Sequence, residues 1–208
     1  MQETIDTLPE REILRYMGFR GEPDASLRSL VQKASALLLA AAEPRWIYVL
    51  SPAVQQPEGV FLTRLGLLLP GKNIKKLFTG CSAGALLGTT LSTAADRLID
   101  RLSLTDLSLA HAVDACAAAA VEELCDRAQA QIARETGHTL TPRFSPGFGD
   151  LPLQLQPELL AALQAGKNIG LSLTDSLLLT PRKSVTAVIG LRDPAPSNAG
   201  PHGGFAPG

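Results

Sequence analysis

The sequence predicts an α+β fold with a central, twisted and mainly antiparallel sheet flanked by helices. Short β-forming runs occur in the first half of the chain and again in its last third, and helical patterns separate the two groups. Strands and helices that gather in separate regions, rather than alternating, are typical of this class. The 208 residues are 45% hydrophobic, which is enough for one substantial core. We therefore expect a single domain over residues 1–192 and a tail over residues 193–208.

Two helices should open the chain. Residues 9–20 begin with a proline and carry glutamates in the first turn, as helix N-termini do. Asp24 can cap a second helix, because its side chain can accept a hydrogen bond from a backbone N–H of the first turn. Apolar residues then recur at helical spacing as far as Ala41, and Pro44 stops the pattern.

A group of strands follows. The run Trp46–Leu50 is dense in β-forming residues and is bounded by Ser51 and Pro52. The stretch 79–92 is small and apolar, and its glycines lack the spacing of a dinucleotide or phosphate-binding loop. The expected elements are strands at 46–50, 59–63 and 65–69, a short basic helix at 71–78, and a buried strand followed by a turn within 79–92.

A helix over residues 92–102 should precede the longest helix, from about Asp106 to Arg134. An apolar stripe runs along this long pattern, Gly137 can end it, and its many alanines predict close packing against a neighbour. Glu122, Glu123 and Asp126 cluster on it, and we interpret them as a solvated face. The remaining expected elements are strands at 138–142, 169–173, 177–180 and 184–191, a short helix at 156–163, and a turn at 174–176.

Composition excludes several classes of function. The net charge of −1 gives no general attraction to nucleic acid or to acidic membranes. The longest apolar runs, Ala36–Ala42 and Ala115–Val121, are too short to cross a bilayer. The N-terminus is acidic and lacks the apolar core of a secretion signal, so we expect a cytoplasmic protein. From Asp193 onward the chain is rich in Pro and Gly and is expected to be disordered.

Few side chains suit catalysis. Three cysteines without metal-type spacing are expected to be free, buried thiols, and Cys116 and Cys125 should lie on opposite faces of the long helix. His111, His138 and His202 form no recognisable nucleophile–base arrangement, so a hydrolase mechanism has little support. No metal site is expected either.

The stretch Arg143–Pro152, with the sequence Arg-Phe-Ser-Pro-Gly-Phe-Gly-Asp-Leu-Pro, is the candidate binding site. Pro146-Gly147 predicts a type II turn, because proline fixes φ and glycine tolerates positive φ. Gly147 and Gly149 lack Cβ atoms, which would allow a ligand to approach the backbone. Arg143 can hold a carboxylate or phosphate with a two-pronged hydrogen bond. From these residues alone, a surface turn with a solvated arginine is the favoured interpretation, because isolated turn motifs are common.

This stretch resembles the Arg-x-x-Pro-Gly-Tyr-x-x-x-Pro motif in the activation domain of cobalamin-dependent methionine synthase. Two further segments are similar in order and spacing. Residues 170–185 resemble the family's Leu-Thr-Glu-Ser, Pro and Ser-Val-Ser-Gly run, and residues 121–127 resemble the Ala-Leu-Ala-Asp-Arg type helix before the motif. The similarity covers about residues 80–192, and the chain looks like a freestanding variant of that domain.

The resemblance implies a site for S-adenosylmethionine. Arg143 would hold the methionyl carboxylate, and Ser145, Pro146, Gly147 and Phe148 would line the adenosine. The family's task is the reductive methylation of inactive cob(II)alamin, in which the cobalamin itself is the nucleophile after reduction. Cobalamin would arrive on a partner, because the chain lacks a corrinoid-binding Asp-x-His-x-x-Gly motif. The implied partners are a methionine synthase or related corrinoid protein and a low-potential electron donor such as flavodoxin or ferredoxin.

The sequence also departs from the family pattern. Phe148 replaces the motif tyrosine, Asp175 replaces a glutamate, and Gln129 and Ala130 stand where the family has a ligand-contacting carboxylate on the long helix. These differences leave a second interpretation open. The protein would then be a non-catalytic scaffold that docks on a corrinoid protein without supporting methyl transfer.

Overall fold

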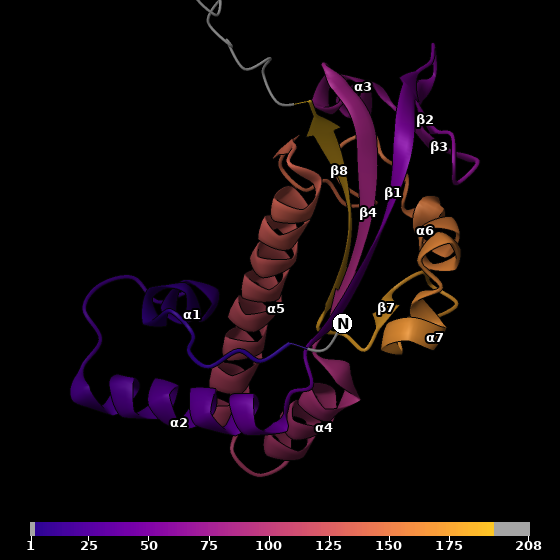
Figure 1. Ribbon diagram of the computed structural model, residues 1–208. Helices are drawn as coiled ribbons and strands as arrows, with labels where there is room; N and C mark the ends of the chain where they lie inside the picture. Colours follow the sequence, from indigo (N-terminus) through magenta and orange to yellow (C-terminus); the bar gives the residue numbers. More distant parts are fainter. Residues whose placement is uncertain (1–2, 194–208) are drawn as a thin grey trace, which may run out of the picture.

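The computed structural model describes residues 3–193 and confirms the α+β class (Figure 1). All pairs of neighbouring strands are antiparallel, in a six-stranded sheet of order β3-β2-β1-β4-β8-β5. These strands are β1 (Arg45–Gln55), β2 (Gly59–Leu62), β3 (Leu67–Pro70), β4 (Cys81–Thr90), β5 (Thr139–Leu140) and β8 (Ser184–Arg192). A separate hairpin consists of β6 (Ser172–Leu173) and β7 (Leu179–Thr180). The predicted tail, apart from its first residue, lies outside the described residues.

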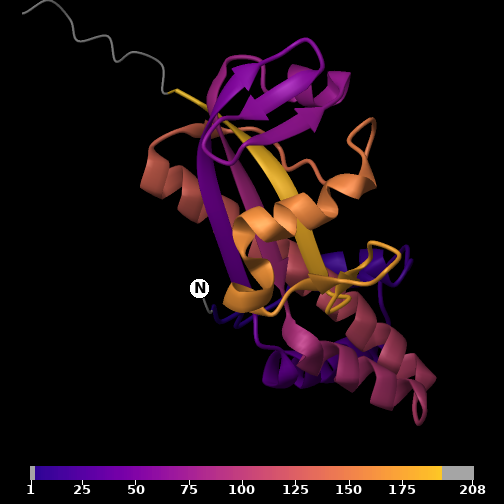
Figure 2. The same cartoon turned by 90° about the vertical axis from the view of Figure 1, so that its right-hand side faces the viewer.

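Helices cover both faces of the sheet. In Figure 1, α5 lies against one face, with α1 and α2 beyond it, and α6 and α7 lie against the other; Figure 2 shows α6 crossing in front of the strands. The helices are α1 (Glu10–Tyr16), α2 (Ala25–Ala41), α3 (Lys72–Leu77), α4 (Ser92–Ser103), α5 (Leu107–Thr136), α6 (Gln156–Leu163) and α7 (Ala165–Ile169), with a 3-10 turn at Leu153–Leu155.

Two hydrophobic cores result, one on each face of the sheet. Leu87 and Ile189 belong to the core that contains α1, α2, α4 and α5, whereas Leu86 and Val188 belong to the core that contains α3, α6 and α7. This alternation follows from the two-residue period of a strand, which turns successive side chains to opposite faces. Since β4 and β8 are buried on both faces, their apolar residues run almost without interruption.

The long helix α5 lies between the sheet and the N-terminal helices. Cys116 lies 3.4 Å from the Ser35 hydroxyl of α2, and Cys125 lies 3.2 Å from the Thr89 hydroxyl of β4. The two cysteines therefore face opposite sides, as predicted, and both are fully buried. Most of the helix's alanines are buried as well, which confirms close packing. No helix within residues 3–193 is both long and apolar enough to cross a membrane.

Two local predictions are wrong. The strand expected to end at Leu50 extends to Gln55, because Pro52 lies at the end of the β1–β4 ladder, where β1 exchanges partner β4 for β2. Proline has no backbone N–H to donate, but at the end of a ladder this does not interrupt strand pairing. The strand expected at 169–173 is α7 followed by the short β6, since a brief apolar run fits a buried helix end as well as a strand.

Candidate ligand-binding site

The Arg143–Pro152 stretch begins along the open edge of the sheet. Thr141 N–H donates to the Gly190 carbonyl at 2.9 Å, and Phe144 exchanges two backbone hydrogen bonds with Val188, at 2.9 and 2.8 Å. The chain after β5 is thus hydrogen-bonded to two residues of β8, Gly190 and Val188. This pairing fixes Arg143 beside the sheet edge and directs it toward α5.

The predicted type II turn is present. Phe148 N–H donates to the Ser145 carbonyl at 3.2 Å, and Gly147 has φ of +91°, close to the value of about +80° that the third residue of such a turn requires. Gly147 N–H also donates to the Leu151 carbonyl at 2.8 Å. Pro146 is buried, whereas the Phe148 ring is 67% exposed. The turn therefore presents one aromatic ring to solvent from a rigid backbone.

The far end of the stretch is tied to α3. The Asp150 carboxylate accepts hydrogen bonds from Lys72 N–H at 2.6 Å and from Asn73 N–H at 3.2 Å. Gly149 has φ of +54°, and a Cβ atom there would lie 2.3 Å from the Asn73 side-chain nitrogen. Gly149 is therefore favoured by its left-handed backbone and by the nearby Asn73 side chain, rather than by the approach of a ligand.

Arg143 is the most heavily bonded residue of the stretch. Its Nη1 donates to Asp126 at 2.6 Å and to Gln129 at 3.0 Å, and its Nη2 donates to Glu122 at 2.9 Å. The Arg143 side chain is 20% exposed. Burial alone would lower the pKa of Arg143, but the hydrogen bond to Asp126 and the charges of its neighbours outweigh burial and raise it. The guanidinium is charged and held in a fixed orientation.

Glu122 and Asp126 are partly solvated, as the sequence predicted, with 46% and 67% of their side chains exposed, but both also pair with Arg143. Together with Gln129 they have i, i+4, i+7 spacing, which places three acceptors on one side of α5. Arg143 crosses to this stripe from a loop that follows the helix. Glu123 points elsewhere and pairs with Arg127 at 2.8 Å. The i, i+4, i+7 spacing could be read from the sequence, but Arg143, which bonds to these residues, lies outside the helix.

Gln129 has a role that sequence reasoning missed. Its side-chain nitrogen donates to the Thr141 carbonyl at 2.9 Å, and its side-chain oxygen accepts from Arg143. The amide therefore joins the loop backbone to the guanidinium and fixes both relative to α5. Although the family places a ligand-contacting carboxylate in this region, Gln129 acts here as a positioning residue for Arg143.

A groove of about 520 Å³ opens between α5, the turn and β8. Its lining residues are Glu122, Gln129, Pro142, Arg143, Phe144, Ser145, Phe148 and Val185. Three of the five predicted site residues, Arg143, Ser145 and Phe148, line it. Pro146 and Gly147 form the turn but do not line the groove. The other lining residues were not predicted, because only the folded chain brings α5 and β8 together at the turn.

The groove leaves part of Arg143 available to a ligand. Arginine has five N–H donors, and the three described bonds occupy both donors of Nη1 and one of Nη2. The Nε–H and the second Nη2–H have no partner among the described residues. A carboxylate can accept a two-pronged bond from two such donors where they lie on one edge of a guanidinium.

Other potentially reactive groups lie elsewhere. Burial raises the pKa of the Cys125 thiol to about 11 and also raises that of Cys116, so neither is a thiolate at neutral pH. Cys81 is only half-buried. His138 follows α5, where its ring nitrogens contact Thr136 and Asp193. Within the described part of the chain, no group of three or more His, Cys, Asp or Glu side chains could hold a metal ion.

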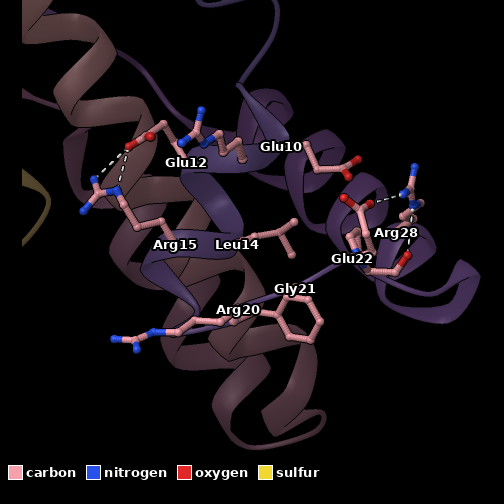
Figure 3. Close-up of a pocket in the computed structure, with 12 residues that line it drawn as sticks. Glu10, Glu12, Leu14, Arg15, Arg20, Gly21, Glu22 and Arg28 are labelled. Atoms are coloured by element: carbon pink, nitrogen blue, oxygen red, sulfur yellow. Dashed lines mark hydrogen bonds and ion pairs between the residues drawn. The ribbon is translucent and has the colours of Figure 1, made fainter.

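A second recess, of about 680 Å³, lies between α1 and the start of α2 (Figure 3). Its charged side chains mainly pair with one another: Arg15 contacts Glu12 at 2.8 Å, and Arg28 contacts Glu22 at 3.5 Å. All four of these side chains are at least 44% exposed. The recess lacks a buried polar group directed into it, and we do not regard it as a binding site.

Comparison with known structures bears on the fold. A crystal structure described as the MetH reactivation domain bound to AdoHcy (S-adenosylhomocysteine) superposes on this chain with a TM-score of 0.69. The match covers 91% of this chain and 77% of that one. This chain has the fold of the MetH reactivation domain. At 16% identity the likeness concerns the fold alone. No protein-family model and no curated protein matches the sequence.

Proposed function

We propose that this protein binds S-adenosylmethionine in the groove beside Arg143 and serves the reductive methylation of cob(II)alamin carried by a partner corrinoid protein. The observation that carries the proposal is the position of Arg143. In a fold shared with a domain that binds AdoHcy, the motif arginine lines a groove and has two N–H donors without a partner among the described residues. The partner would be a methionine synthase or a related corrinoid protein.

The groove fits a ligand of this size and chemistry. Its volume of about 520 Å³ lies within the range of ~300–1,000 Å³ that holds drug-sized molecules. Arg143 offers a fixed cation for the methionyl carboxylate, Ser145 offers a hydroxyl, and the exposed ring of Phe148 offers a flat apolar surface for an adenine or a partner's cofactor. The remaining task of the protein is to orient the bound molecule.

The chemistry comes from the two cofactors. The partner's cob(II)alamin, together with one electron from a low-potential donor such as flavodoxin or ferredoxin, would supply the acceptor for the sulfonium methyl group, and S-adenosylhomocysteine would be the other product. No side chain of this protein is a nucleophile in that sequence. The absence of a triad among the predicted candidates is compatible with such a role, because the protein would contribute binding and orientation.

Calorimetric titration with S-adenosylmethionine tests the proposal. We expect saturable binding by the wild type and a loss of roughly 10- to 150-fold in affinity for Arg143→Ala, the range expected for one charged hydrogen-bonded contact. Arg182→Ala is the matched control, because Arg182 also bridges two carboxylates, those of Asp96 and Asp100, but lies outside the groove. Equal binding by the wild type and Arg143→Ala, or no binding by the wild type, would refute the proposal.

A second candidate function is a scaffold that docks on a corrinoid protein without methyl transfer. The replacement of the motif tyrosine by Phe148 favours it, since the hydroxyl that could hydrogen-bond to a partner's cofactor is lost. The two functions differ in one assay, in which cob(II)alamin on the partner is treated with a low-potential reductant. Methylcobalamin that forms only when this protein and S-adenosylmethionine are both present supports the first function. Stable complex formation without methylcobalamin supports the second.

A further inference from the structure

The charged cluster of Arg143, Glu122 and Asp126, at one side of the groove, carries a net negative charge. Arg143 contributes +1, and the two carboxylates bound to it, Glu122 and Asp126, contribute −2, which leaves −1. Of these three residues, Glu122 and Arg143 line the groove, and the other residues that line it are uncharged. On the neighbouring side of α5, Glu123 and Arg127 pair with each other, so their charges largely cancel. An arginine site that only holds a carboxylate would be expected to carry a net positive charge, whereas this cluster carries a net negative charge.

The substrate and product of the proposed reaction differ in charge at one atom. S-adenosylmethionine has a sulfonium, an ammonium and a carboxylate, with a total of +1. S-adenosylhomocysteine keeps the adenosine and both ends of the amino acid but has a neutral thioether, with a total of 0. Contacts to the shared parts cannot distinguish the two molecules, whereas the electrostatic field at the sulfur can.

We infer that the groove selects the sulfonium over the thioether by charge, with Glu122 and Asp126 as the residues that determine this specificity. The inference rests on the proposed function and goes further, because it assigns to the Arg143 site both a preference for the methyl donor and an easier release of the spent product. The two carboxylates act through the field at the sulfur position. They remain bound to Arg143, which holds them in place.

The size of the effect follows from geometry and exposure. A methionyl carboxylate on Arg143 would place the sulfur a few bonds away, and we take roughly 7 Å as its separation from the net charge of −1. The side chains of Glu122 and Asp126 are 46% and 67% exposed, which calls for an effective dielectric constant of about 40–80. Under these conditions the sulfonium form binds about 3- to 8-fold more tightly than the thioether at low salt. Salt should reduce the ratio, since exposed charges are screened.

The measured quantity is the ratio of the two dissociation constants, product over substrate, from calorimetry at low ionic strength. We expect about 3–8 for the wild type and about 1 for Asp126→Asn or Glu122→Gln. In the double variant we expect a ratio below 1, because Arg143 alone makes the groove positive. Both substitutions keep an oxygen that can accept from Arg143, so the clamp is preserved. Sinefungin, in which a charged amine replaces the sulfonium, should bind like the substrate.

Glu123→Gln is the matched control, because it removes the same charge from the adjacent residue on a different side of α5. It should leave the ratio at the wild-type value. A wild-type ratio of 1 or less, or an equal change in the control, would overturn the charge-selection inference while leaving the proposed function standing. Absence of binding for both ligands would instead overturn the proposed function, and this inference with it.

Discussion

Asp150 connects the candidate site to a helix that precedes it by almost eighty residues, and its replacement by alanine should disturb both. The N-terminus of α3 has no cap of its own, since its N-cap residue is Gly71. Asp150 supplies the missing acceptor by taking hydrogen bonds from Lys72 N–H at 2.6 Å and Asn73 N–H at 3.2 Å. The same carboxylate also fixes the end of the turn that presents Phe148.

The expected cost can be estimated from other helix caps. Removal of a capping side chain costs about 0.5–2 kcal/mol, and we expect about 1 kcal/mol because Asp150 is exposed and α3 is short. For a chain of this size, such a loss lowers the melting temperature by roughly 2–4 °C. Asp150→Asn keeps an oxygen acceptor and loses only the charge, so it should be milder. Thermal unfolding monitored by circular dichroism measures both effects.

The affinity for S-adenosylmethionine distinguishes the two roles of Asp150, as the cap of α3 and as the support of the turn. If the carboxylate holds the turn as well as the helix, the affinity of Asp150→Ala for S-adenosylmethionine should fall several-fold, while Asp150→Asn stays near the wild type. Asp175→Ala is the control, because Asp175 is an exposed aspartate in the turn between β6 and β7 with no described partner. A melting temperature for Asp150→Ala equal to that of Asp175→Ala would contradict the capping argument.

Four further outcomes are expected. At pH 8 a thiol reagent should modify Cys81 in the folded protein, and Cys116 and Cys125 only after unfolding, since both are fully buried. Burial raises the folded-state pKa of Cys125 to about 11, so its contribution to the free energy of unfolding should decline as pH rises from about 8.5 to 11, and Cys125→Ser should remove that decline. Gln164 is exposed and left-handed, with φ of 48°, so Gln164→Gly should stabilise the protein by about 0.5–1 kcal/mol in urea denaturation. Gly149→Ala should destabilise it by at least ~1 kcal/mol in the same assay, because alanine would be forced into the left-handed conformation and its methyl group would displace the Asn73 side chain.

Local sequence signals predicted most of the helices and strands correctly. Asp24 and Asp106 accept hydrogen bonds from backbone N–H groups of the turns they cap, and Gly137 ends α5 in the left-handed conformation. These features depend on neighbours within one helical turn, so the sequence contains all the information they need. The type II turn at Pro146-Gly147 was predictable for the same reason.

The composition of the site was not predictable in this way. Arg143 is 17 residues from Asp126 and 21 from Glu122, and no local rule states which of several loops will cross a given stripe of a helix. A row of acidic residues on a helix surface is usually solvated, and Arg143 reaches this one because Thr141 and Phe144 pair with β8 and Gln129 holds the loop to α5. The groove is a product of tertiary contacts.

The contacts that hold Arg143 also change what the arginine can do. A solvated arginine would attract any anion, whereas this one has already committed three donors to Glu122, Asp126 and Gln129. Phosphate and simple carboxylates would approach a guanidinium whose charge is more than balanced by its partners. A molecule with both a carboxylate and further positive charge can use the free edge of Arg143 and the field of the two acids together. The arrangement therefore favours zwitterionic and cationic amino-acid derivatives over plain anions, which is a narrower ligand class than the motif arginine alone implies.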